Sequence, residues 1–252
     1  MSSRKISRKK SVKKRARSAS RPRNMQYHSS LVRLATPEKK YLDNYHASDL
    51  TSDAADAQNV VSNFLVMSAG GAVNQRIGNR IMLRNINIRG EVFTRVPNTG
   101  DLMTYIVRVV LVQDLQCNGT TPDYEDVFRP PSAIPSAVPP TAIVSTQVTP
   151  LWFRDMESAR RFRVLKEKTF VLEPKIFVPA TPSPFQAKVF FKMSWRGAMP
   201  IHYNDSTANT NNIMSNNVYL MFAVTPASVN APAVATHPAR VQVVSRLKYT
   251  DL

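Results

Sequence analysis

Eleven positively charged side chains lie within the first 23 residues, and no acidic residue lies among them. Each guanidinium or ammonium group can neutralise a phosphate and release condensed counterions, so this segment can bind a nucleic-acid backbone without reading its base sequence. Arginine side chains also stack on unpaired bases, which favours a single strand. The predicted nucleic-acid-binding residues of the segment are Arg4, Lys5, Arg8, Lys9, Lys10, Lys13, Lys14, Arg15, Arg17, Arg21 and Arg23.

A second basic stretch, "QRIGNRIMLRNINIRGEVF" from Gln75 to Phe93, surrounds a predicted strand. We predict that Arg76, Arg80 and Arg84 bind nucleic acid as well, on a surface continuous with the N-terminal segment. The alternative is a basic, solvated face that only keeps the strand soluble. Arg89 belongs to the same pattern under either interpretation.

The N-terminal segment also has two interpretations. A run of charge is often only a solvated tail, but a run this dense repels itself unless a polyanion neutralises it. We therefore favour nucleic-acid binding. The sequence "KKRAR" at residues 13–17 has in addition the composition of a nuclear-import signal, and the two roles are compatible.

Catalytic and metal-binding patterns are missing from the sequence. The seven glycines form no phosphate-binding loop, and the four histidines are too far apart for a close metal pair. Cys117 follows a predicted buried strand, and nothing nearby would lower the pKa of its thiol. We predict no catalytic residue, no cofactor and no metal ion, and hence a protein that is not an enzyme.

The composition predicts one folded domain with a charged extension. The chain has 252 residues, of which 43% are apolar, and carries a net charge of +17. The first 23 residues supply 11 of its 34 bases, so the remainder is only mildly basic. Residues 1–35 have no apolar periodicity and are predicted to be a disordered arm, followed by a folded domain at 36–252. A single cysteine fits a reducing environment, and no apolar run predicts membrane insertion.

Eight strands are predicted from the apolar pattern. Three segments alternate apolar and polar residues with period two, as a strand with one buried face does. Met82, Ile86, Ile88 and Val92 form the buried face of the first of these segments. Two other segments are continuous apolar runs typical of strands covered on both faces. The predicted strands are 39–47, 59–67, 81–93, 105–113, 161–172, 187–196, 218–225 and 240–250.

The connections between these strands are long and unequal. Seven prolines between Gln113 and Pro150 predict an extended surface excursion, and one or two helical turns are predicted within residues 150–162. Eight strands with almost no helix favour an antiparallel β-sandwich, either an eight-stranded jelly roll or a seven-stranded immunoglobulin-like sandwich.

Four segments of the chain, taken together, resemble one family. They are the basic arm at 4–23, "PEKKYLDNY" at 37–45, "NQRIGNRIMLRNINIRG" at 74–90 and "VRVVLVQD" at 107–114, which a Pro-rich loop follows. In order and spacing they are similar to the capsid proteins of circovirus-like viruses, whose small circular single-stranded DNA genomes encode a replication initiator. The arm is shorter than in some of these relatives.

The resemblance implies an all-β fold: a single eight-stranded antiparallel jelly-roll sandwich with a disordered basic N-terminal arm. It also implies self-assembly into a T=1 icosahedral shell of sixty subunits around a single-stranded DNA genome. The protein would then occur in the virion and, during assembly, in the host nucleus. A host import receptor and a cell-surface receptor are further candidate partners.

Three rival functions remain open on the sequence alone. The capsid of a small single-stranded RNA virus also pairs a basic arm with a jelly roll. A cellular basic nucleic-acid-binding protein with a β domain could carry the same arm. A β-sandwich hydrolase with scattered acids is the enzymatic rival, and the missing catalytic pattern argues against it.

Overall fold

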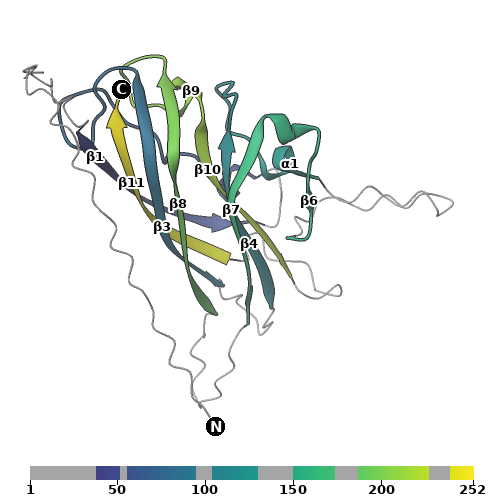
Figure 1. The fold of residues 1–252 in the computed structure, drawn as a ribbon. Helices are drawn as coiled ribbons and strands as arrows, with labels where there is room; N and C mark the ends of the chain where they lie inside the picture. The colour runs from purple at the N-terminus through teal and green to yellow at the C-terminus, as the bar shows by residue number, and fades with distance from the viewer. Residues whose placement is uncertain (1–37, 52–55, 95–103, 130–149, 174–186, 227–238) are drawn as a thin grey trace, which may run out of the picture. The chain divides into compact units, whose positions relative to one another are not determined.

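The computed structural model of the chain describes residues 38–51, 56–94, 104–129, 150–173, 187–226 and 239–252 (Figure 1). All of them belong to one unit, Pro37–Leu252. The basic segment at 1–23 and the predicted disordered arm at 1–35 lie outside the described residues.

Four long strands and one short strand form the first sheet. Their order is β1-β11-β3-β8-β9, and all neighbours are antiparallel. Burial alternates along β3, β8 and β11 because one side chain in two points into the core and the next points outward. The strands are β1 (Lys39–Leu50), β11 (Ala239–Asp251), β3 (Arg80–Thr94), β8 (Lys188–Tyr203) and β9 (Ile213–Ser215).

The second sheet has the antiparallel order β2-β10-β4-β7. Its central strands β4 and β10 are buried along almost their whole length, as their continuous apolar runs predict. The strands are β2 (Val60–Val61), β10 (Asn217–Pro226), β4 (Tyr105–Asp114) and β7 (Phe162–Leu172).

The chain passes from one sheet to the other at every connection between main strands except β4 to β7, which is the connectivity of a jelly roll. In chain order, the first, third, sixth and eighth of the main strands (β1, β3, β8 and β11) enter one sheet and the other four (β2, β4, β7 and β10) enter the second. A large apolar core, which includes Ile86, Phe191 and Phe222, fills the space between the sheets. The predicted all-β, antiparallel jelly-roll sandwich is therefore confirmed.

A short insertion between β4 and β7 packs on the outside of the second sheet (Figure 1). Its residues 123–129 and 150–161 form α1 (Tyr124–Val127), β5 (Phe128–Arg129), β6 (Phe153–Arg154) and the 3-10 turn η2 (Ser158–Arg160). Tyr124, Phe128 and Trp152 build a second apolar core against β4 and β10. Two further 3-10 turns are η1 (Ala57–Asn59) and η3 (Thr210–Asn212).

Two local predictions were wrong. The strand predicted at 59–67 is regular only at Val60–Val61, although Phe64, Leu65 and Met67 are buried after it. The helix predicted within 150–162 is a short strand followed by a single 3-10 turn. The only α-helix among the described residues is α1, which lies in the Pro-rich excursion that the sequence predicted to be extended.

A β-bulge at Arg84 corrects the predicted faces of β3. Leu83 and Asn85 are paired with both neighbouring strands, while the pairing skips Arg84. One extra residue reverses the alternation, so Ile81 and Leu83 are buried before the bulge and even-numbered residues after it. Met82 is therefore half-buried rather than part of the dry face.

Candidate nucleic-acid interface

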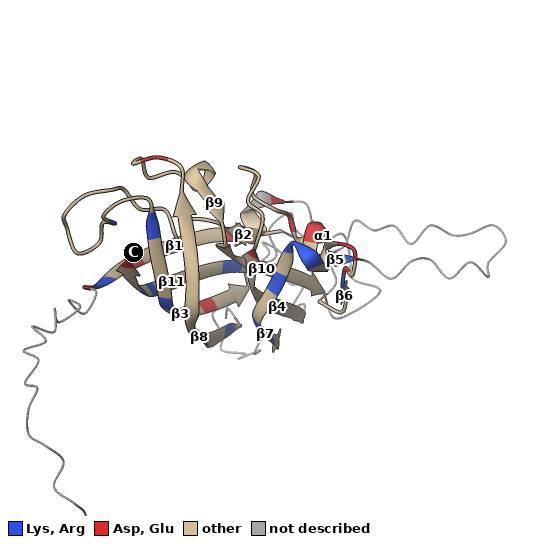
Figure 2. Ribbon diagram, turned by 45° about the horizontal axis from the view of Figure 1, so that its top comes forward, with Lys and Arg blue, Asp and Glu red and all other residues tan. Residues whose placement is uncertain are grey.

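The outer face of the first sheet is a basic surface of the described residues. Strands β1, β3, β8 and β11 together carry eleven bases and four acids. Figure 2 shows blue segments on β3, β8 and β11 and red segments around α1. Blue segments also lie on β4 and β7, but the excess of bases over acids is larger on the first sheet, seven against two.

All four acids of these strands are already paired. Asp43 binds Arg246, Glu91 binds Lys188, Asp49 binds Arg240, and Asp251 binds the buried Lys40. Seven bases are left without a carboxylate partner within the described part of the chain. They are Lys39, Arg80, Arg84, Arg89, Lys192, Arg196 and Lys248.

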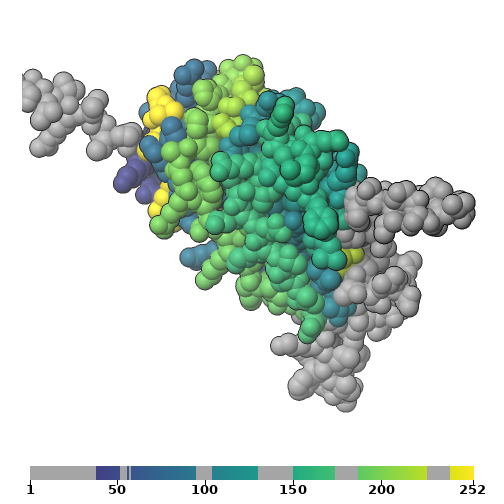
Figure 3. Space-filling view, turned by 45° about the vertical axis from the view of Figure 1, so that its right-hand side comes forward, coloured from purple at the N-terminus to yellow at the C-terminus, as the bar shows by residue number. Residues whose placement is uncertain are grey.

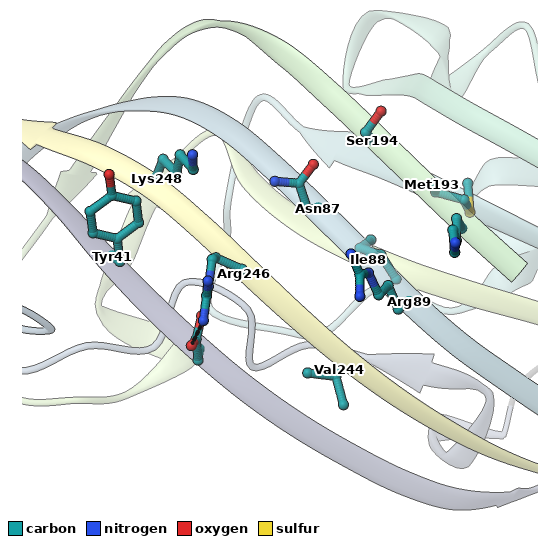
Figure 4. Close-up of a pocket in the computed structure, with 11 residues that line it drawn as sticks. Tyr41, Asn87, Ile88, Arg89, Met193, Ser194, Val244, Arg246 and Lys248 are labelled. Atoms are coloured by element: carbon teal, nitrogen blue, oxygen red, sulfur yellow. Dashed lines mark hydrogen bonds and ion pairs between the residues drawn. The ribbon is translucent and has the colours of Figure 1, made fainter.

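An open groove of about 810 Å³ runs across this face (Figure 4). The strand order places the first and last strands of the fold side by side, so residues from distant parts of the sequence line one groove. Its lining residues are Tyr41, Asp43, Asn87, Ile88, Arg89, Lys192, Met193, Ser194, Val244, Arg246 and Lys248. We call this surface the sheet groove.

One ion pair shapes the charge of the sheet groove. Both nitrogens Nε and Nη2 of Arg246 donate to the Asp43 carboxylate, at 2.7 and 2.6 Å. These hydrogen bonds hold the pKa of Asp43 below its ordinary value. Arg246 is therefore partly neutralised, and Arg89, Lys192 and Lys248 carry the uncompensated positive charge of the groove.

Aromatic and polar side chains accompany these charges. The Lys248 ammonium lies 5.3 Å from the centre of the Tyr41 ring, and Tyr45 on the same face of β1 is 61% exposed. Exposed aromatic rings next to cations are the components of single-strand binding surfaces, because bases stack on the rings while the cations track the phosphates. Asn87 and Ser194 add hydrogen-bonding groups.

Of the four arginines in the basic stretch at Gln75–Phe93, three are exposed on β3 and Arg76 is buried. Arg80 and Arg84 are exposed residues of β3, and the bulge at Arg84 presents its side chain to solvent. Arg89 is exposed in the sheet groove. The predicted role of Arg80 and Arg84 therefore becomes part of the proposal below, together with Arg89 of the sheet groove.

Arg76 has a structural role instead, which corrects its prediction. Its side chain is fully buried and lies over the Tyr203 ring, 4.2 Å from the ring centre. Its guanidinium donates to the carbonyls of Met67, Gly78 and Asp205 and to the side chain of Asn79. Arg76 thus joins two loops of the protein and has no face left for a phosphate.

The basic residues that sequence reasoning missed are Lys192, Arg246 and Lys248. Each lies on the polar face of a predicted strand. The recurrence of basic residues at alternate positions could therefore have indicated a basic surface. The missing information was the strand order, because β11 lies between β1 and β3 and thereby brings residues 41–45, 87–89 and 244–248 together.

The described residues supply little for catalysis. They contain no group of three His, Cys, Asp or Glu side chains able to hold a metal ion. Burial raises the pKa of the Cys117 thiol to about 11, so this thiol is neutral at pH 7. Asp126 accepts a hydrogen bond from the backbone N–H of Asp123 at the start of α1, which is a structural use of that acid. No helix in the described part has the length and apolar character needed to span a bilayer.

A jelly roll with an uncovered basic sheet and a strongly basic N-terminal segment has the features of a viral capsid protein, one of the protein classes built on this fold. Residues 1–248 match the model of the geminivirus coat protein/nuclear export factor BR1 family, and the chain belongs to this family. The predicted class, a coat protein of a single-stranded DNA virus, is thereby confirmed, whereas the match is to the geminivirus family and not to the circovirus-like group. A search of curated proteins finds no match.

Proposed function

We propose that this chain is the subunit of a small icosahedral T=1 capsid of sixty copies and that it packages a single-stranded DNA genome electrostatically. The basic residues between Arg4 and Arg23 would supply most of the affinity. The sheet groove, together with the exposed Arg80 and Arg84 on strand β3, would supply a second and weaker contact. No base-specific contact is required.

The observation that carries this proposal is the unequal distribution of charge. The four long strands of the first sheet have seven more bases than acids, whereas the four strands of the second sheet have four bases and two acids, an excess of only two. Such a one-sided field attracts a polyanion to one face of the domain. Exposed Tyr41 and Tyr45 on that face favour unpaired bases over a duplex.

The charge of the N-terminal segment determines how many phosphates of the genome the proposed capsid could neutralise. Sixty copies of a segment with eleven positive charges would bring about 660 charges to the genome, which neutralise a similar number of phosphates. Because each neutralised phosphate releases counterions, we expect the affinity to fall steeply with salt concentration and to depend little on base sequence.

The decisive experiment removes this charge from the assembled protein. Deleting residues 1–23 should leave a folded jelly roll that forms empty particles or none. In a matched variant of full length, glutamine replaces all eleven bases. The ratio of absorbance at 260 and 280 nm of purified particles measures their nucleic acid. Packaging at the wild-type level in both variants would contradict the proposal.

The rival polyanion is RNA, since electrostatic packaging does not by itself distinguish the two. Sequencing the nucleic acid from particles formed in infected cells separates these functions. Predominantly viral single-stranded DNA supports the proposal, and predominantly viral RNA favours the rival.

We propose further that "KKRAR" at residues 13–17 directs the chain to the host nucleus through an import receptor. A fluorescent protein fused to residues 1–35 should accumulate in nuclei. Replacing Lys13 and Lys14 by glutamine in the fusion should abolish this accumulation, and unchanged nuclear fluorescence would contradict the role. A cell-surface receptor for assembled particles remains a proposed partner.

A further inference from the structure

Three large apolar side chains of the insertion are exposed to solvent, although such side chains are usually buried. Leu151, Phe153 and Met156 are 76%, 78% and 79% exposed, the three highest values among the large apolar side chains of the described residues. They lie within six residues of sequence, in the part of the insertion around β6. Patches of this kind on a folded domain mark interaction sites. We call these three residues the insertion patch.

Buried residues between the insertion patch and strand β4 hold the patch in a fixed position. Trp152 lies between Leu151 and Phe153 in sequence but points the other way and is only 3% exposed. Its carbonyl accepts a hydrogen bond of 2.7 Å from Nη1 of the buried Arg108 in β4. Arg108 also binds Glu167 and the Tyr124 hydroxyl and lies over the Phe128 ring. The patch therefore stands on a packed support.

Further hydrogen bonds fix the two ends of the patch. Phe153 pairs with Arg129 in the β5-β6 ladder, and the backbone N–H of Asp155 donates to the carbonyl of Val127 at 2.9 Å. Arg154 donates to the carbonyls of Ala159 and Phe162. A contact made by such a pre-ordered surface loses little conformational entropy on binding. Figure 3 shows the teal and green segments of this region spread over one side of the molecule.

The charge around the patch argues against nucleic acid as its partner. The described insertion carries five acids and four bases, in contrast to the excess of seven bases on the first sheet. At the rim, Arg129 is 59% exposed and Glu157 is 77% exposed. These two side chains already form an ion pair with each other, so the rim is nearly neutral and does not repel the same rim of a second copy.

We propose that the insertion patch is a contact between copies of this chain, and that its occupant is the insertion patch of a second copy. The inference rests on the assembly proposed above and names the surface that performs it. The first sheet of each copy carries seven more bases than acids and repels the same sheet of another copy, so association is favoured at the insertion, where charge is balanced and apolar area is available.

The first test measures assembly. The variant Leu151→Ser with Phe153→Ser should raise the protein concentration needed for particle formation by about thirtyfold, as expected when apolar anchors of an interface are lost. Sedimentation velocity and negative-stain microscopy follow the particles, and circular dichroism shows whether the subunit is folded. The matched control is Phe190→Ser, because Phe190 is 72% exposed on the opposite sheet. Equal losses in both variants would overturn the proposal.

The second test reports the location of the contact directly. A cysteine is placed at Met156 in a Cys117→Ser background, and its reaction with a thiol reagent is compared between dissociated subunits and particles. We expect rapid labelling of subunits and protection in particles. Labelling at the same rate in both would overturn the proposal. Protection already in dissociated subunits would also overturn it, because a segment of the same chain would then cover the patch.

Failure of this inference is distinguishable from failure of the proposed function. If the patch variants form particles with wild-type nucleic-acid content, the contact is misplaced and the capsid function stands. If the wild-type protein forms no particles under any condition, the proposed assembly itself is wrong. The nucleic-acid affinity of dissociated subunits should be unchanged by Leu151→Ser and Phe153→Ser.

Discussion

The outer faces of the two sheets differ in covering and in charge. The first sheet exposes its outer face, and its strands alternate apolar and basic residues. In the second sheet the insertion covers the central strands β4 and β10, which are largely apolar, while the edge strand β7 is mostly exposed. The comparison shows that one fold separates two tasks: an uncovered sheet can carry charge for a polyanion, and a covered sheet can support an apolar contact surface.

The largest predicted effect is a loss of stability when the apolar core between the insertion and the second sheet is disrupted. Replacing Trp152, which is 3% exposed in the second core, by alanine should lower the free energy of unfolding by about 3 to 5 kcal/mol, because it leaves a cavity between the insertion and β4. Urea unfolding of dissociated subunits measures this. Phe190→Ala removes an aromatic ring from the uncovered face and should cost less than about 0.5 kcal/mol. Similar losses for both variants would contradict the difference between the faces.

A smaller effect is expected on the uncovered face. Replacing Arg89 and Lys192 together by alanine removes two uncompensated charges from the sheet groove. For single-stranded DNA the slope of log affinity against log salt should become shallower by about 1.4, with little change in stability. Fluorescence anisotropy at several salt concentrations tests this prediction. The matched control is Arg163→Ala with Lys166→Ala on β7 of the other sheet, and an equal change of slope there would argue against the sheet groove.

The smallest effect concerns the acid inside the groove. Asp43→Asn should release Arg246, raise the groove charge by one, and increase the affinity for single-stranded DNA a few-fold at low salt. Unchanged or weaker binding by this variant at pH 7 would contradict the role of the pair.

The same pair gives a pH dependence of stability. The folded-state pKa of Asp43 is lowered, so the stabilisation is fully present above the ordinary value of 3.8 and is lost as the pH falls through the lower folded value. Both side chains are about half exposed, so the loss should be small. Thermal unfolding of wild type and Asp43→Asn between pH 2 and pH 6 measures it, and a larger loss in the variant would reverse the assigned sign.

The sequence predicted the long strands well because local pattern determines them. The apolar runs that became β4 and β10 and the alternation along β8 and β11 follow from which faces are buried. The failures depend on distant partners. The bulge at Arg84 is defined by pairing with both β8 and β11, and no local signal marks it.

Arg76 shows the same limit for the candidate site. In sequence it stands with Arg80 and Arg84 in one basic stretch. Its burial depends on the carbonyl of Asp205, 129 residues away, and on the Tyr203 ring. The sheet groove likewise combines cations from three strands that only the strand order brings together. The sequence therefore predicted that this region is rich in basic residues, but it did not predict which of them are exposed and which are buried.

The position of β11 between β1 and β3 has a consequence for the timing of folding. Ala239–Asp251 is synthesised after every other strand, yet it pairs with β1 along twelve residues and supplies Val244, Arg246 and Lys248 to the groove. Until that strand leaves the ribosome, β1 lacks its neighbour in the sheet and the groove is incomplete. A chain truncated before Ala239 thus cannot present the assembled basic face, because formation of this surface depends on pairing between strands that are distant in sequence.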